Sequence, residues 1–241
     1  MEIVIIYMKR KVVQIIGGSA STAYALDEGQ LPWPELFAKR NPQFLVSHSP
    51  RAGLSFVQSF DCLNEVEFCD ILILHFGTST AWPRSLIKFS FSFHQPPKIY
   101  VGDVRYKISK NLKLRVRNII KYVLFFAGLY RPVTSFREIQ DQVSAVSKIA
   151  LSKAHKVVWI QHQSIHTSRI VLERSLYRRY YREIIDALSP LISENFRVLQ
   201  LPKNFLRADN FLLDGVHLTA QGHKELAELI EEKFGGLLSD D

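Results

Sequence analysis

Five short apolar runs, each followed by glycine or polar residues, divide the chain. They cover residues 12–16, 44–47, 71–76, 156–161 and 197–201. Runs that are almost continuously apolar are typical of strands buried on both faces, as in parallel sheets covered by helices. The pattern therefore predicts five strands, of which residues 71–76, Ile-Leu-Ile-Leu-His-Phe, are the clearest.

Helical patterns lie between these strands. A short helix is expected from Pro34, because proline suits a first helical turn, and longer ones at 135–153, 169–188 and 219–234. The last carries an apolar stripe among Glu and Lys: Leu226, Ala227, Leu229, Ile230 and Phe234. Alternating strands and helices predict an α/β fold, a three-layer α/β/α sandwich with a mostly parallel five-stranded sheet. A length of 241 residues suits one domain over 1–241.

Four polar turns follow predicted strands. They are Gly17-Gly18-Ser19, the loop around Gly53, Gly77-Thr78-Ser79, and the turn from Asp214 to His217. Because ligands bind beyond the carboxyl ends of parallel strands, we expect these turns to meet at one edge of the sheet.

Ser19, Asp214 and His217 are the residue types of a Ser-His-Asp hydrolase. Asp214, three residues before His217, is placed to accept from one ring nitrogen and so direct the other toward the serine. Structural roles compete: Ser19 also fits a helix N-cap, and His217 also fits a residue preceding a helix capped by Thr219. His223 is interpreted as a packing or surface histidine.

The ordered blocks resemble the SGNH (GDSL-like) hydrolase superfamily over nearly the whole chain. Gly17-Gly18-Ser19 is similar to the nucleophile block, and Asp214-Gly-Val-His217 with the following Leu-Thr-Ala-Gln-Gly-His to the final block. The resemblance implies a flavodoxin-like fold, a catalytic triad of Ser19, Asp214 and His217, and an oxyanion hole that includes the amides of Ser19 and Gly53.

Two positions depart from the family pattern. Gly18 stands where the family has Asp, outside the triad. Ser79 stands where the family has an Asn that donates to the oxyanion, and loss of such a donor costs about 3 kcal/mol of transition-state stabilisation. Ser79 is a shorter donor, and Thr78 or Thr80 is an alternative. A slow or specialised enzyme is therefore expected, and an inactive binding domain remains an alternative.

The net charge of +8 is concentrated in residues 98–131, which hold nine Lys or Arg and one acid, Asp103, interleaved with aromatic residues. This segment belongs to an expected insertion at about 88–150. A solvated helix, a pocket for an anionic acyl or glycan substrate, and a membrane-surface helix are all compatible with it. Nucleic acid binding is ranked low, because no recognition motif accompanies the charge.

Other chemistry is limited in this sequence. His162 and His166 follow the fourth strand and, with Thr78, are expected to line the substrate cleft. They offer no third metal ligand, and neither a metal nor an organic cofactor is expected. Cys62 and Cys69 are interpreted as small core residues. No secretory signal or membrane-spanning run is recognised, and a cytoplasmic location is expected.

These observations favour a serine-dependent acyl ester hydrolase acting on an acylated carbohydrate or polysaccharide precursor, either neutral or anionic. The alternatives are an O-acyltransferase with the same triad, a weak or inactive domain that binds its ligand, and an adaptor that uses the basic segment.

Overall fold

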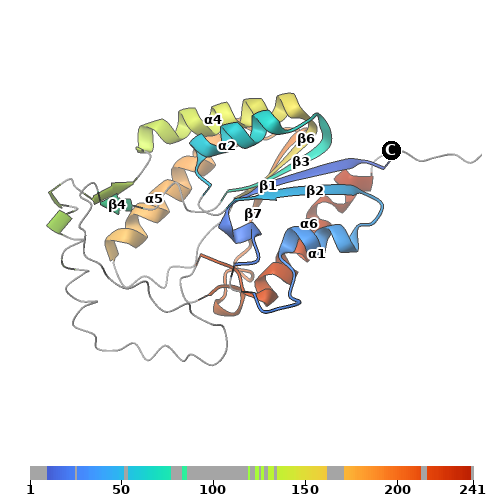
Figure 1. Ribbon diagram of the computed structural model, residues 1–241. Coiled ribbons are helices and arrows are strands. Elements are labelled where there is room, and N and C mark those ends of the chain that lie inside the picture. Colours follow the sequence, from blue (N-terminus) through green and yellow to red (C-terminus); the bar gives the residue numbers. More distant parts are fainter. Residues whose placement is uncertain are drawn as a thin grey trace, which may run out of the picture.

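The computed structural model has one five-stranded parallel sheet between two layers of helices (Figure 1). It describes residues 10–24, 26–51, 54–76, 83–85, 119, 123–124, 126–127, 130–132, 135–161, 171–212 and 216–239. The strand order is β2-β1-β3-β6-β7. Counted along these five strands alone, the order is 2-1-3-4-5, as in flavodoxin-like folds. The predicted fold class is confirmed.

Each predicted strand is present, and its bounds differ from the prediction by at most three residues. The strands are β1 (Val12–Gly17), β2 (Leu45–Pro50), β3 (Cys69–Phe76), β6 (Ala154–Gln161) and β7 (Phe196–Gln200). β1 and β3 are central and pair in register from Val13 with Ile71 to Gly17 with His75. Their carboxyl ends therefore lie side by side.

Alternate residues of the strands pack into two separate hydrophobic cores, one on each face of the sheet. Leu72, Leu74 and Phe76 pack with α2 (Phe56–Glu65), α4 (Phe136–Lys153) and α5 (Val171–Leu188). Ile71 and Ile73 pack on the opposite face with α1 (Trp33–Arg40) and α6 (Ala220–Ser239). His75 follows in the same alternation, so its side chain belongs to the α1/α6 face.

The helix α2 was not predicted from the sequence. Ser55 caps it: its side chain accepts from the backbone N–H of Gln58, while the Gln58 side chain accepts from the backbone of Ser55. This capping box is a sequence signal for a helix start. The buried residues Phe56, Cys62 and Leu63 then anchor the helix on the sheet.

A small antiparallel pair lies apart from the main sheet. β4 (Pro83–Ser85) and β5 (Tyr130–Pro132) bring together the two ends of the segment between them. The expected insertion at 88–150 overlaps α4, whose Ile139, Val143 and Val146 belong to the core. Residues 86–118 lie outside the described part, so the extent and role of the insertion stay predictions.

Both cysteines are free and buried. Burial raises the pKa of the Cys69 thiol to about 11, which leaves it protonated near neutral pH and unsuited to nucleophilic or metal chemistry. Among the described residues there is no cluster of potential metal ligands, and no helix there is long and apolar enough to cross a membrane.

Candidate active site at the carboxyl edge of the sheet

Ser19 begins a short turn that follows β1 after one intervening residue, Gly18. This turn is a 3-10 helix, η1 (Ser19–Ser21), whose N-cap is Gly18. Its geometry is fixed by the bonds from the Ser21 N–H to the Gly18 carbonyl, at 2.9 Å, and from the Thr22 hydroxyl to the Ser19 carbonyl, at 2.7 Å. Ser19 therefore does not occupy the capping position that was an alternative role, and its half-buried side chain remains available for chemistry.

His217 lies in a loop that is closed just before α6. The Leu212 N–H donates to the His217 carbonyl at 2.8 Å, and Phe211 forms a bridge with Leu218. Thr219 then caps α6 by accepting from the Gly222 N–H at 3.1 Å, as the sequence predicted. A Cβ at position 222 would stand 2.1 Å from the Asn210 carbonyl oxygen, so only glycine allows α6 to begin this close to the loop.

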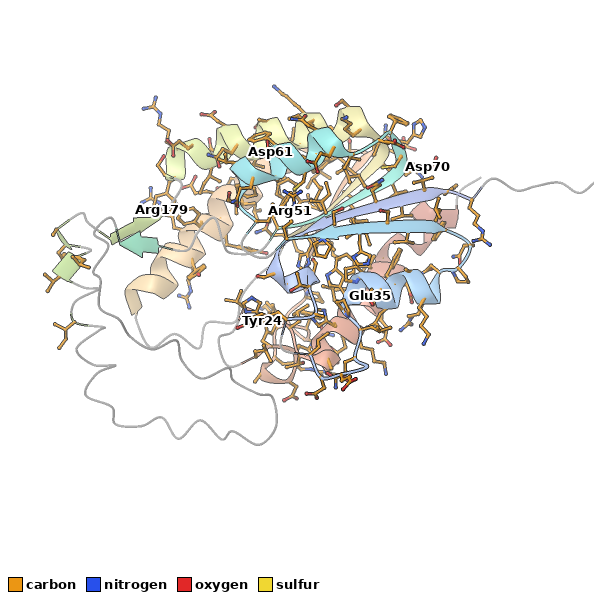
Figure 2. All side chains as sticks on the ribbon, in the orientation of Figure 1. Tyr24, Glu35, Arg51, Asp61, Asp70 and Arg179 are labelled. Atoms are coloured by element: carbon orange, nitrogen blue, oxygen red, sulfur yellow. The ribbon has the colours of Figure 1, made fainter. Side chains whose placement is uncertain are left out.

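A ring contact joins these two distant segments. Tyr24, five residues after Ser19, stacks on His217 with ring centroids 4.3 Å apart and planes tilted by 33°. Figure 2 shows Tyr24 at the same end of the sheet as Arg51, which follows β2, whereas Asp70 of β3 lies at the other end. The segment that carries Ser19 and the loop that carries His217 thus meet at the carboxyl edge, as the sequence predicted.

Glu225 on α6 anchors the loop before His217. Its carboxylate accepts from Asn210 at 2.6 Å, from Gln221 at 2.7 Å, and from Arg207. Burial alone would raise the pKa of this carboxyl, but the hydrogen bonds and the Arg207 charge outweigh burial and hold the pKa below its ordinary value of 4.5. Because the Asn210 carbonyl accepts from the Thr219 N–H, the anchor extends to the start of α6.

We expect Glu225→Gln to lower stability at pH 7 by about 1 kcal/mol. A depressed folded pKa gives stability that is present above the unfolded pKa, here the ordinary value of 4.5, and is lost as pH falls through the folded value. The gap in unfolding midpoint between wild type and variant should therefore narrow below about pH 4. The matched control is Glu228→Gln. Glu228 lies on α6 like Glu225, but its carboxylate is exposed and pairs with Arg40 of α1, so its loss should change stability less. An equal loss of stability in Glu225→Gln and Glu228→Gln would contradict the proposed anchoring role of Glu225.

Several predicted site residues lie outside the described part of the chain. They are Asp214, Gly53, Thr78, Ser79, the alternative donor Thr80, His162 and His166. Their roles as triad acid, oxyanion donors and cleft residues stay predictions. Ser19 and His217 are the two that the structure describes.

Two residues near the site were missed by sequence reasoning. Tyr24 gave no signal, because its role depends on a contact with a residue far along the chain. His75 did give one: it is a polar residue in an otherwise apolar strand, and such a side chain requires a buried partner. That partner is Ser21, whose Oγ lies 2.7 Å from His75 Nδ1.

The Ser21–His75 pair has the distance of a nucleophile and its base, but not the access. Both residues are 0% exposed, and a substrate carbonyl cannot approach a hydroxyl that is enclosed by the core. Ser19 on the outer side of the same turn is the candidate nucleophile.

Solved structures to which the chain is similar include esterases and lipolytic proteins. The chain is similar to a member of the lipolytic protein G-D-S-L family from Veillonella parvula, with 12% identity, a TM-score of 0.58, and coverage of 93% of this chain and 98% of that one. It is similar to the acetylxylan esterase Axe2 from Geobacillus stearothermophilus, with 10% identity, a TM-score of 0.57, and coverage of 96% and 95%.

A third similar structure is the esterase EstA from Pseudoalteromonas inhibited by monoethylphosphonate, with 10% identity, a TM-score of 0.56, and coverage of 95% and 100%. No protein-family profile and no curated protein sequence matches the chain. At this level of identity the likeness shows an SGNH hydrolase-like fold, which confirms the predicted resemblance for the fold.

Proposed function

We propose that this SGNH-fold chain is a serine-dependent acyl ester hydrolase with Ser19 as nucleophile, His217 as general base and Asp214 as its orienting acid. The observation that carries the proposal is the stacking of Tyr24 on His217 at 4.3 Å. It brings the loop of the base against the segment that begins with the serine, at the edge of the sheet where this class of fold binds ligands.

The proposed reaction has two steps. His217 takes the proton of the Ser19 hydroxyl as Oγ bonds to the acyl carbon, and the same imidazole protonates the leaving alkoxide when the ester bond breaks. Water then attacks the acyl-enzyme with His217 again as base, which releases the acid and restores Ser19. The amides of Ser19 and Gly53, with Ser79, would donate to the oxyanion. Because Ser79 replaces the family's Asn, slow turnover is expected.

An O-acylated carbohydrate, such as a polysaccharide precursor, is the proposed substrate. The acetylxylan esterase with the same fold supports this class by analogy. Thr78, His162 and His166 are proposed to line this cleft, and residues 98–131 to meet an anionic substrate or a membrane surface. No metal or organic cofactor takes part in the proposed reaction.

The test is product analysis with a panel of O-acetylated sugars and oligosaccharides, neutral and anionic, with and without acceptor alcohol. Free acetate formed at a rate independent of the acceptor is the expected result. Acetate that is replaced by acylated acceptor would show an acyltransferase with the same residues. No product with any ester, together with saturable binding of the glycan, would replace the proposal by a domain that only binds its ligand.

A further inference from the structure

Three buried side chains from three elements meet at the turn that carries Ser19. Ser21 Oγ in η1 and Trp33 Nε1 at the start of α1 lie 2.7 Å and 3.0 Å from His75 Nδ1 in β3. Trp33 Nε1 also lies 3.2 Å from Ser21 Oγ. All three residues are 0% exposed. They form a closed triangle, which we call the buried triangle.

Hydrogen-bonding capacity makes this triangle rigid. The indole N–H can only donate, so it must point toward Ser21 Oγ or His75 Nδ1. The Ser21 hydroxyl donates to an unprotonated Nδ1, or its oxygen accepts from Nδ1–H, so the contact is satisfied in either tautomer. Each broken bond would leave a polar group unpaired inside the core, which costs more than the bond itself is worth.

His75 holds the turn of Ser19 on both sides. Its backbone carbonyl accepts from the Gly18 N–H at 2.9 Å, one residue before Ser19. Its side chain holds Ser21, two residues after Ser19. Gly17 leaves the necessary room, because a Cβ at this position would stand 2.2 Å from Ser21 Oγ and 2.6 Å from Ser21 Cβ.

Trp33 also connects the buried triangle to α6 through a further hydrogen bond. Its backbone N–H donates to His223 Nδ1 at 3.1 Å, and His223 is 1% exposed. The accepting Nδ1 carries no proton while this bond is made. Since α6 follows the loop of His217, one tryptophan binds both the turn of the candidate nucleophile and the helix behind the candidate base.

We propose that Ser21, His75 and Trp33 are positioning residues, which fix the turn of Ser19 and, through Trp33 and His223, hold it in register with the loop of His217. The inference rests on the proposed function, because it concerns the alignment of that nucleophile and base. Misplacing reacting groups by about 1 Å costs up to about a hundredfold in rate, so loss of the triangle should slow acylation of Ser19 more than it weakens binding.

The test is the kinetics of labelling of the full chain by a fluorophosphonate, with the maximal rate separated from the half-saturating probe concentration. Ser21→Ala and Trp33→Phe each remove one polar group of the triangle with little change of shape. We expect each to lower the maximal rate about tenfold with the half-saturating concentration within about twofold. The double variant should be little slower than either single one, because one triangle is broken in each case.

Matched controls remove similar groups elsewhere in the core. Ser59→Ala deletes a 0% exposed hydroxyl that donates to the Phe56 carbonyl at 2.6 Å. Trp159→Phe deletes a buried indole N–H that has no hydrogen-bond partner among the described residues. Both control variants should be labelled at the wild-type rate.

Variants of His75 give a further comparison. His75→Asn, which keeps a polar group near the place of Nδ1, should be labelled faster than His75→Leu.

The outcomes separate the two proposals. If Ser19 of the wild type is labelled, but Ser21→Ala and Trp33→Phe react as fast as the two controls, the positioning role is wrong and the proposed function stands. If the probe does not modify Ser19 in the wild type, the proposed function fails first. Should Trp33→Phe not fold, Ser21→Ala decides, since it removes one oxygen atom only.

Discussion

Ser19→Ala is expected to abolish labelling by a fluorophosphonate and to lower ester hydrolysis by about 10⁴- to 10⁶-fold. The reason is that alanine offers no atom on which an acyl-enzyme can form, whereas the remaining donors and binding contacts supply only residual catalysis. Ser19 is half-buried at the first position of η1, so the substitution should leave the melting temperature nearly unchanged. The measurement is ester turnover by the purified variant beside its thermal melt.

Ser59→Ala is the control for this change, because it removes a buried serine hydroxyl that donates to the Phe56 carbonyl within α2. It should keep wild-type turnover. A Ser19→Ala protein that hydrolyses esters within about tenfold of wild type would rule out covalent catalysis at Ser19.

His217→Ala should slow hydrolysis nearly as much as Ser19→Ala, and combining the two should cost little more. A nucleophile and its base act as a unit, so removal of either already removes the covalent route. Loss of the base also leaves the Ser19 hydroxyl a poor nucleophile, and labelling should slow by a similar factor. The measurement is a double-mutant cycle on ester turnover.

His155→Ala provides the matched histidine control. His155 is exposed, packs on Phe68 with ring centroids 4.7 Å apart, and lies near the start of β6 at the opposite edge of the sheet. It should retain full activity. Multiplicative effects of Ser19→Ala and His217→Ala would show that the two residues act independently, which contradicts a triad.

The strands were predictable because burial on both faces leaves an almost continuous apolar signal. The apolar pattern at 71–76 predicted β3, but the strand itself begins earlier, at Cys69. In this added part, the Asp70 carboxylate accepts from the Val12 N–H at 2.7 Å. That contact with β1 is tertiary and has no local signature. The helix α2 was missed although its capping box and the one-sided spacing of Phe56, Cys62 and Leu63 were both readable in the sequence.

The site was predictable only as far as local motifs reach. Ser19 and His217 stand in recognisable blocks, and the sheet topology brings their segments to one edge. Tyr24, Trp33 and His75 carry no such motif. Their positions follow from packing between η1, α1, β3 and the loop before α6, which are separated by most of the chain. Sequence reasoning can flag a buried histidine as one that needs a partner, but it cannot name the partner.

The most direct test of the central claim is peptide mapping by mass spectrometry after reaction of the wild type with a fluorophosphonate. The account predicts a single phosphonylated residue, Ser19, with modification that is fast in wild type and nearly lost in His217→Ala. Modification of another serine, or labelling of Ser19 that proceeds equally well without His217, would contradict it.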